Sequence, residues 1–96
     1  MFLHIGNGIT VRQKDIIGIF DLDTASVSSL TKRFLTKAEK SGVLLDAAEG
    51  EIPRSFLLVS EKKQRNKEAD ISVKLSLISS AALKLRVLRA AEETEE

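Results

Sequence analysis

The pattern of hydrophobic and polar residues predicts three strands in the first fifth of the chain. Residues 2–5 (FLHI) and 9–12 (ITVR) are short β-prone runs on either side of a Gly-Asn-Gly sequence at residues 6–8. Gly and Asn tolerate the positive φ angles of tight turns, so this arrangement predicts a β-hairpin. Residues 15–20 (DIIGIF) predict a buried third strand, in which Gly18 indicates a bulge or a close neighbouring backbone.

The next element is a helix, predicted at residues 25–41. Its apolar residues recur at helical spacing on one face: Val27, Leu30, Phe34, Leu35 and Ala38. Asp23 or Thr24 is expected to cap its start, and Gly42 to end it. The solvent face of this helix is basic, with Lys32, Arg33, Lys37 and Lys40.

Two further strands and a loop are predicted in the middle of the chain. Residues 43–54 are either a strand or a connector, and residues 55–59 (SFLLV) are a strand. Residues 60–70 contain a single apolar residue and predict a solvated loop. Residues 71–78 alternate between apolar residues and Ser72, Lys74 and Ser76, which predicts a half-buried strand that pairs antiparallel with 55–59.

A second helix is predicted after Ser79 or Ser80, and its apolar residues spread over more than one face: Leu83, Leu85, Val87 and Leu88. The excess apolar surface indicates contact with a partner subunit, and a close intramolecular fit is the alternative. The order β-β-β-α-β-β-α predicts an α+β domain over residues 1–91, with a small, mostly antiparallel sheet and two helices. Residues 92–96 are expected to form a disordered acidic tail.

The charge is unevenly distributed along the 96 residues, although the net charge is only +1. Four of the 14 acidic residues lie in 92–96, so residues 1–91 hold 15 basic and 10 acidic groups, a net +5. Such an excess is compatible with a polyanionic partner. The chain has no Cys and one His, His4, so we expect no disulfide, no metal centre and no cofactor. Without a signal peptide or a membrane-spanning run, we expect a cytoplasmic protein with no membrane partner.

The candidates for catalysis and ligand binding have simpler explanations. A phosphate-binding loop needs a helix after its glycines, whereas a strand follows Gly8, so the hairpin turn is favoured over a nucleotide site. Asp21 and Asp23 carry carboxylates, the type of ligand that divalent cations prefer, but Asp is also the expected residue before a helix, and capping is favoured over a cation site. A Ser-His-Asp triad would have to use His4. We therefore expect no enzyme and no small-molecule substrate.

Basic residues remain as candidates for contact with nucleic acid. Arg12 and Lys14 lie two residues apart on a predicted extended segment, so they are expected on the same face. Arg54 follows Pro53 at the entrance of a strand. The basic residues of the 60–70 loop are interpreted as a solvated hairpin tip in preference to a DNA contact; they are Lys62, Lys63, Arg65 and Lys67.

Three stretches carry a family resemblance: FLHIGNGITVRQKDIIGIFDLDTA, then TKRFLTKAEKSGVLLDAAEG, then KLSLISSAALKLR. Together they resemble the small bacterial extracellular matrix regulatory proteins of the Rem family, and the IGIFDLDT run looks closer to the RemB branch than to the RemA branch. Proteins of the RemA branch are DNA-binding activators of biofilm-matrix genes that form ring-like homo-oligomers. The resemblance therefore implies a homo-oligomeric transcription regulator that contacts the DNA sugar-phosphate backbone.

The resemblance also implies which residues contact DNA. Lys32 and Arg33 match a Lys-Arg pair of the RemA helix, and Arg54 matches the last Arg of an Arg-rich turn. The two preceding arginines of that turn fall on Glu51 and Ile52 in this chain.

A further functional Arg of the RemA branch falls on Asp15, beside Lys14. From the residues and the resemblance together, the expected DNA contacts are Arg12, Lys14, Lys32, Arg33 and Arg54. The alternative function is an oligomeric interaction or scaffold protein without strong DNA binding of its own. The apolar last helix and the missing Arg pair favour that alternative.

Overall fold

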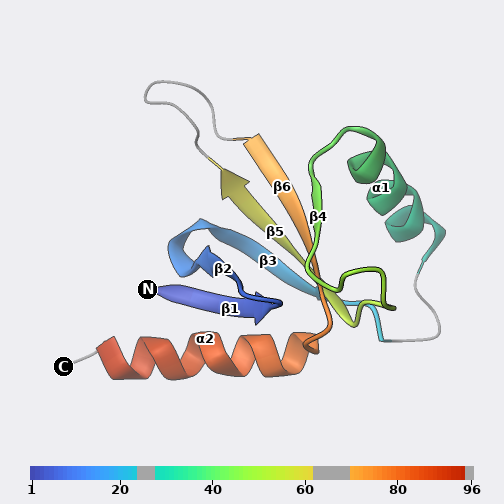
Figure 1. Cartoon of the computed structure of the whole chain (residues 1–96). Helices are drawn as coiled ribbons and strands as arrows, with labels where there is room; N and C mark the ends of the chain where they lie inside the picture. Colours follow the sequence, from blue (N-terminus) through green and yellow to red (C-terminus); the bar gives the residue numbers. More distant parts are fainter. Residues whose placement is uncertain (24–27, 62–69, 95–96) are drawn as a thin grey trace.

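The computed structural model describes residues 1–23, 28–61 and 70–94. Within these residues the fold is α+β, as predicted (Figure 1). The elements in chain order are β1 (Phe2–Gly6), β2 (Ile9–Arg12), the 3₁₀ turn η1 (Gln13–Asp15), β3 (Ile16–Asp21), α1 (Ser29–Lys40), β4 (Leu44–Asp46), β5 (Ser55–Glu61), β6 (Asp70–Ser76) and α2 (Ser80–Thr94). The short strand β4 lies in the segment that the sequence left open between a strand and a connector.

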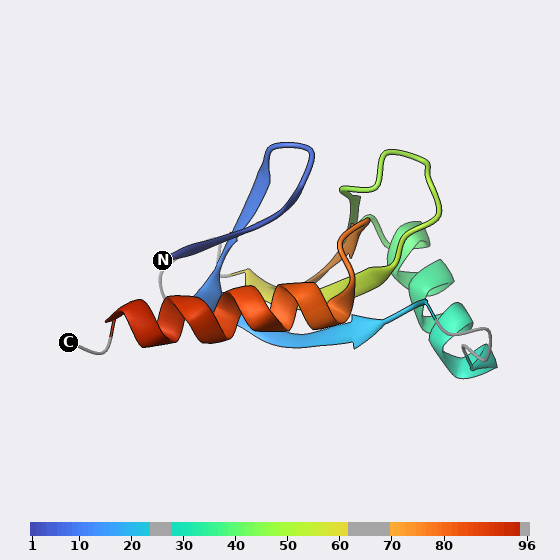
Figure 2. The same ribbon diagram turned by 90° about the horizontal axis from the view of Figure 1, so that it is seen from below.

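The main sheet has the strand order β3-β5-β6-β4. Strand β5 pairs antiparallel with both β3 and β6, while β4 pairs parallel with β6. The sheet is therefore mostly antiparallel, as predicted. Strands β1 and β2 form a separate two-stranded sheet, which stands over one face of the main sheet (Figure 2).

The Gly-Asn-Gly sequence is the turn of this β1–β2 hairpin, as predicted. Gly6 pairs with Ile9, and the two residues between them, Asn7 and Gly8, have φ angles of 52° and 73°. Positive φ at both central positions is the geometry of a type I′ turn, which matches the twist of the two strands. The Asn7 side-chain amide also donates a hydrogen bond to the carbonyl of Ala47, which fixes the turn to the segment after β4.

Both faces of the main sheet are covered. The hairpin and α2 cover one face, where the core consists of Leu3, Ile5, Val11, Ala47, Leu57, Val59 and Leu83. Helix α1 covers part of the other face, where Ala38 packs with Phe56 and Val73. The central strand β5 is consequently almost entirely buried. Strand β3 lies at an edge of the sheet and has no buried residue, and Ile17 is 57% exposed, so the prediction that this strand is buried was wrong.

The prediction of a half-buried strand at 71–78 was wrong in its pattern of burial. Ser72 and Ser76 are buried, while Ile71, on the apolar side of the pattern, is exposed. The reason is the hairpin, which packs over the serine face of β6: the Ser76 hydroxyl donates to the carbonyl of Ile5 at 2.6 Å.

The start of the first helix also differs from the prediction. Ser28 is the cap, since its Oγ accepts a hydrogen bond from the backbone N–H of Thr31 at 3.1 Å, and α1 begins at Ser29. Asp23 is therefore not the cap, and residues 24–27, with the predicted cap Thr24, lie outside the described residues. The second helix begins as predicted, with the Ser79 hydroxyl accepting from the Ala82 N–H at 3.1 Å.

Two of the predicted segments, the 60–70 loop and the acidic tail, lie only partly within the described residues. Residues 60, 61 and 70 of the predicted loop belong to strands β5 and β6, and residues 62–69, with their four basic side chains, lie outside the described residues. Helix α2 runs to Thr94 and so includes residues 92–94 of the predicted tail, while residues 95 and 96 lie outside the described residues.

Candidate nucleic-acid interface

The five expected DNA contacts lie at two opposite ends of the main sheet. Arg54 immediately precedes β5, whereas Arg12 lines a cleft beside Val59, Ser60 and Glu61 at the far end of the same strand. Six residue steps of an extended strand, from Ser55 to Glu61, span about 20 Å. One chain therefore does not bring the five cations into one compact patch.

Helix α1 presents the first group. Its inner side packs on the sheet through Leu35 and Ala38, which leaves Lys32 and Arg33 exposed. The start of α1 lies at the same end of the sheet as the start of β5, which carries Arg54 (Figures 1 and 2). Lys37 and Lys40 continue the basic character of this helix, which holds one acidic residue, Glu39.

Both backbone groups of Arg54 are hydrogen-bonded, and its side chain is paired with a carboxylate. Its N–H donates to the carbonyl of Ser76 at 2.8 Å, and its own carbonyl accepts from the N–H of Leu22 at 2.9 Å. The guanidinium forms an ion pair with Asp23, in which Nη2 lies 2.8 Å from Oδ2. The hydrogen bond and charge of Asp23, with a smaller contribution from Asp21, raise the pKa of Arg54. Arg54 is thus a permanent cation, but a neighbouring carboxylate reduces its field.

The second group consists of Arg12 and Lys14. These two residues do not lie on one extended segment, so the prediction that the alternation of a strand places them on the same face was wrong. Arg12 is the last residue of β2, and Lys14 is in the 3₁₀ turn η1. Lys14 is exposed. Arg12 Nε lies 3.9 Å from Asp15 Oδ2, a long ion pair in an exposed position.

The sequence interpretation missed three cations on α2: Lys84, Arg86 and Arg89. All three are exposed. The signal in the sequence was the helical spacing of Leu83 and Val87. These two residues face the core, so Lys84, Arg86 and Arg89 lie on the outer side of the helix. Arg86 and Arg89 line a groove together with Gln13 of η1, so they belong to the same end of the molecule as Lys14.

The turn before Arg54 is exposed at both positions where the resemblance implied arginines. Glu51 is exposed, and Ile52 is 88% exposed, the highest fraction among the exposed large hydrophobic residues of the described chain. The backbone therefore already displays these two positions at the Arg54 end of the sheet. The chain places an acidic and an aliphatic side chain there instead of two cations.

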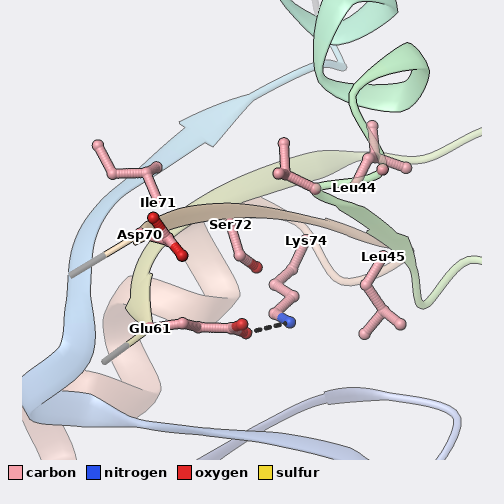
Figure 3. A pocket seen from close by; sticks show the side chains of 9 residues that line it. Leu44, Leu45, Glu61, Asp70, Ile71, Ser72 and Lys74 are labelled. Atoms are coloured by element: carbon pink, nitrogen blue, oxygen red, sulfur yellow. Dashed lines mark hydrogen bonds and ion pairs between the residues drawn. The ribbon is translucent and has the colours of Figure 1, made fainter. Parts of the chain in front are cut away.

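The cleft beside β4 and β6 does not supply an anion site. It has a volume of about 450 Å³, and among the described residues that line it Lys74 is the only cation (Figure 3). Lys74 Nζ lies 2.8 Å from Glu61 Oε1, and only 14% of the lysine side chain is exposed. Because this ammonium is already paired, the exposed cations of α1 and α2 are better candidates for contact with phosphate.

The carboxylates of Asp21 and Asp23 are engaged within the protein. Asp21 Oδ1 accepts a hydrogen bond from the N–H of Asp23 at 3.0 Å, and Asp23 pairs with Arg54. Across the described residues there is no group of three or more His, Cys, Asp or Glu side chains that is arranged to hold a metal ion.

These observations define a small α+β protein with a basic helical face and a second group of cations at the opposite end. The family model described as "RemA-like: Extracellular matrix regulatory protein A-like" matches residues 2–87. The chain therefore belongs to the RemA-like family of extracellular matrix regulatory proteins. No curated protein matches it. None of the helices in the described part of the chain is long and apolar enough to cross a membrane.

Proposed function

We propose that this chain is a DNA-binding transcription regulator of extracellular matrix genes, of the type that controls biofilm formation, and that it acts in the cytoplasm as a homo-oligomer closer to the RemB branch. Membership of the RemA-like family supports the regulatory role. The basic face of α1 supports the choice of DNA as the partner. The contacts are Lys32, Arg33 and Arg54 at one end, and Arg12 and Lys14 at the other.

The observation that carries the proposal is the position of Lys32 and Arg33. Both are exposed on a helix that packs on the sheet by its opposite side, and Arg54 lies at the same end of the sheet. Lysine and arginine side chains in such positions bind phosphate and release condensed counterions, which makes the affinity strongly salt-dependent. None of these contacts reads a base, so the sequence preference is expected to be modest.

Oligomerisation compensates for the small number of contacts in each chain. Two or three phosphate contacts at each end of one chain give weak binding, but several linked copies bind one DNA molecule with a much higher combined affinity. The two separated groups of cations are consistent with this arrangement, because repetition of the chain places cations at regular intervals along a DNA path.

The test is a titration of a fluorescently labelled duplex at about 50 mM and about 200 mM salt. Each phosphate contact contributes about 0.9 to the slope of log K against log salt, so Lys32→Gln with Arg33→Gln is expected to flatten the slope by about two. Lys84→Gln is the control, because it removes an exposed cation from a different helix. Absence of duplex binding at the lower salt concentration, or an unchanged slope in the α1 variant, contradicts the proposal.

A second candidate function is an oligomeric interaction or scaffold protein, and exposed apolar residues favour it. Phe20 is 42% exposed, although its ring stacks on Phe56 with a centroid distance of 4.9 Å. Leu85 and Leu88 are exposed on α2. Light scattering on the wild type and on Leu88→Glu tests for an assembly through α2. An oligomer that does not bind duplex supports this second function, and a strict monomer contradicts both.

A further inference from the structure

A groove lies between helix α2 and the outer edge of β1, the edge that does not pair with β2. Figure 1 shows β1 lying alongside α2. The groove has a volume of about 390 Å³, and its lining includes Phe2, His4, Gln13, Arg86 and Arg89. This size is within the range of small-molecule binding sites, which is about 300–1,000 Å³.

The groove is positively charged. Arg86 and Arg89 are one helical turn apart, which places their side chains on neighbouring positions of the same helix face. Neither forms an ion pair with a side chain in the described part of the chain, and the described lining includes no acidic residue. This situation differs from that of Arg12, Arg54 and Lys74, each of which has a carboxylate partner.

One of the two arginines is held in place by the backbone of β1. Arg86 Nη1 donates to the carbonyl of His4 at 3.1 Å. A guanidinium has five N–H donors, so this bond positions the group and leaves donors for a ligand. Planar guanidinium groups bind phosphate through paired N–H···O bonds, which makes two adjacent arginines a suitable phosphate site.

An aromatic ring lies at the same groove. Phe2 is 63% exposed, the highest fraction among the four phenylalanines of the chain. Exposed aromatic rings beside cations are the surfaces on which unpaired bases stack. The Gln13 side chain adds an amide donor and acceptor.

We propose that this groove binds an unpaired nucleotide, with Arg86 and Arg89 on its phosphate and Phe2 stacked on its base. The site lies at the opposite end of the molecule from α1, so it does not depend on the proposed duplex contact. The same chemistry is available from a free nucleotide and from a nucleotide within a single strand. A paired base in a duplex is not accessible for this stacking.

Two probes distinguish these sources: dTMP, and a labelled oligo-dT of about ten nucleotides. Binding of the oligonucleotide is measured by fluorescence anisotropy and that of dTMP by calorimetry. Binding of dTMP identifies a site for free nucleotides, and binding of oligo-dT alone identifies a site for single strands. If neither probe binds, or if inorganic phosphate at the same concentration displaces the oligonucleotide completely, the proposal is overturned.

Variants of the full chain locate the site. Because Arg86 bonds to the backbone of β1, Arg89→Gln and Phe2→Ala are the informative changes, and circular dichroism with thermal unfolding verifies that they fold. Each is expected to weaken probe binding about tenfold, in line with the loss of one stacked base or one charged phosphate contact. Lys84→Gln, on the same helix but outside the groove, is expected to bind as the wild type does.

Unchanged binding in both Arg89→Gln and Phe2→Ala overturns the proposal, as does oligo-dT binding that is lost only in the Lys32→Gln, Arg33→Gln variant. Loss of duplex binding alone in that α1 variant leaves this site intact, so the two proposals fail separately.

Discussion

Arg54 and Asp23 form an ion pair between residues 31 positions apart in the sequence. Arg54 Nε lies 2.9 Å from Asp23 Oδ2 and 3.2 Å from Oδ1, and Nη2 lies 2.8 Å from Oδ2. The pair connects the end of β3 to the start of β5. It also places a negative charge beside a cation that the proposed function assigns to DNA phosphate.

Replacement of Asp23 by Asn is expected to strengthen DNA binding. The change removes the competing carboxylate while Arg54 keeps its charge, because the pKa of Arg54 lies far above neutral pH even without its partner. Because Arg54 is already one of the proposed contacts, its release strengthens that contact and is expected to steepen the slope of log K against log salt by at most about 0.9. Stability is expected to change little, because both side chains of the ion pair are exposed to solvent, which screens the pair.

The matched control for this variant is Asp70→Asn, which removes an exposed carboxylate from the opposite end of the sheet. It changes the net charge by the same amount. Equal effects of the two variants on duplex titration would show that net charge, not the release of Arg54, determines the affinity.

Two buried serines on the same side of β6 are expected to respond differently to truncation. The Ser76 hydroxyl donates to the carbonyl of Ile5 at 2.6 Å and accepts from the N–H of Ile78 at 3.0 Å. Ser76→Ala leaves both backbone groups without this partner and is expected to cost about 1–3 kcal/mol of unfolding free energy. Ser72 Oγ is buried and has no hydrogen-bond partner among the described residues, so Ser72→Ala is expected to be neutral or stabilising.

Urea denaturation of the two serine variants measures this difference directly. The two changes remove the same atom from two buried positions on one face of β6, which are separated on that face by Lys74, so each serves as the control for the other. Equal destabilisation by the two would contradict the structural distinction between a bonded and an unbonded hydroxyl.

The ring of Phe20 occupies the space that a side chain at residue 18 would need, so we expect any residue larger than Gly18 to disturb this ring. A Cβ atom at residue 18 would lie 2.7 Å from Cε2 of Phe20, closer than real contacts allow. Gly18→Ala must therefore shift the ring of Phe20 relative to Phe56, and because this ring is partly exposed the cost is expected to be about 1 kcal/mol. The cost is expected to disappear in a Phe20→Ala background, and a double-mutant cycle measured by urea denaturation gives the coupling.

The features that depend on the preferences of a few consecutive residues could be predicted from the sequence. Asn7 and Gly8 define the hairpin turn through their backbone preferences. Ser79 caps α2 at the position expected from the pattern. These features depend on residues within a few positions of one another, so a reading along the chain detects them.

Features that depend on distant segments could not be obtained in the same way. The alternation in β6 was correct as a strand pattern, but burial of Ser76 depends on the hairpin that begins at Phe2. Asp23 is the expected type of residue for a helix cap, yet Arg54 competes for its carboxylate from 31 positions away. The grouping of cations at two ends of the sheet depends likewise on strand order, which the sequence pattern left unspecified.

The exposed turn before Arg54 gives the most direct test of how the proposed DNA surface is built. Replacement of Glu51 and Ile52 by Arg places two cations at the positions where the resemblance to the RemA branch implies them. Because both side chains are exposed, the double variant is expected to change stability by about 0.5 kcal/mol or less per residue. The net charge rises from +1 to +4, since the first change adds two charges and the second adds one.

The expected result is a steeper salt dependence of duplex binding, by about two in the slope of log K against log salt, because two further phosphates are contacted. The control is Asp70→Arg with Ile71→Arg, which makes the same exchange of an acidic residue and an isoleucine at exposed positions on the other end of the sheet. An unchanged salt slope in the Glu51, Ile52 variant would contradict a DNA path across the Arg54 turn. A gain confined to the Glu51, Ile52 variant means that the duplex passes this turn, since direct phosphate contacts act only over the distance of a side chain.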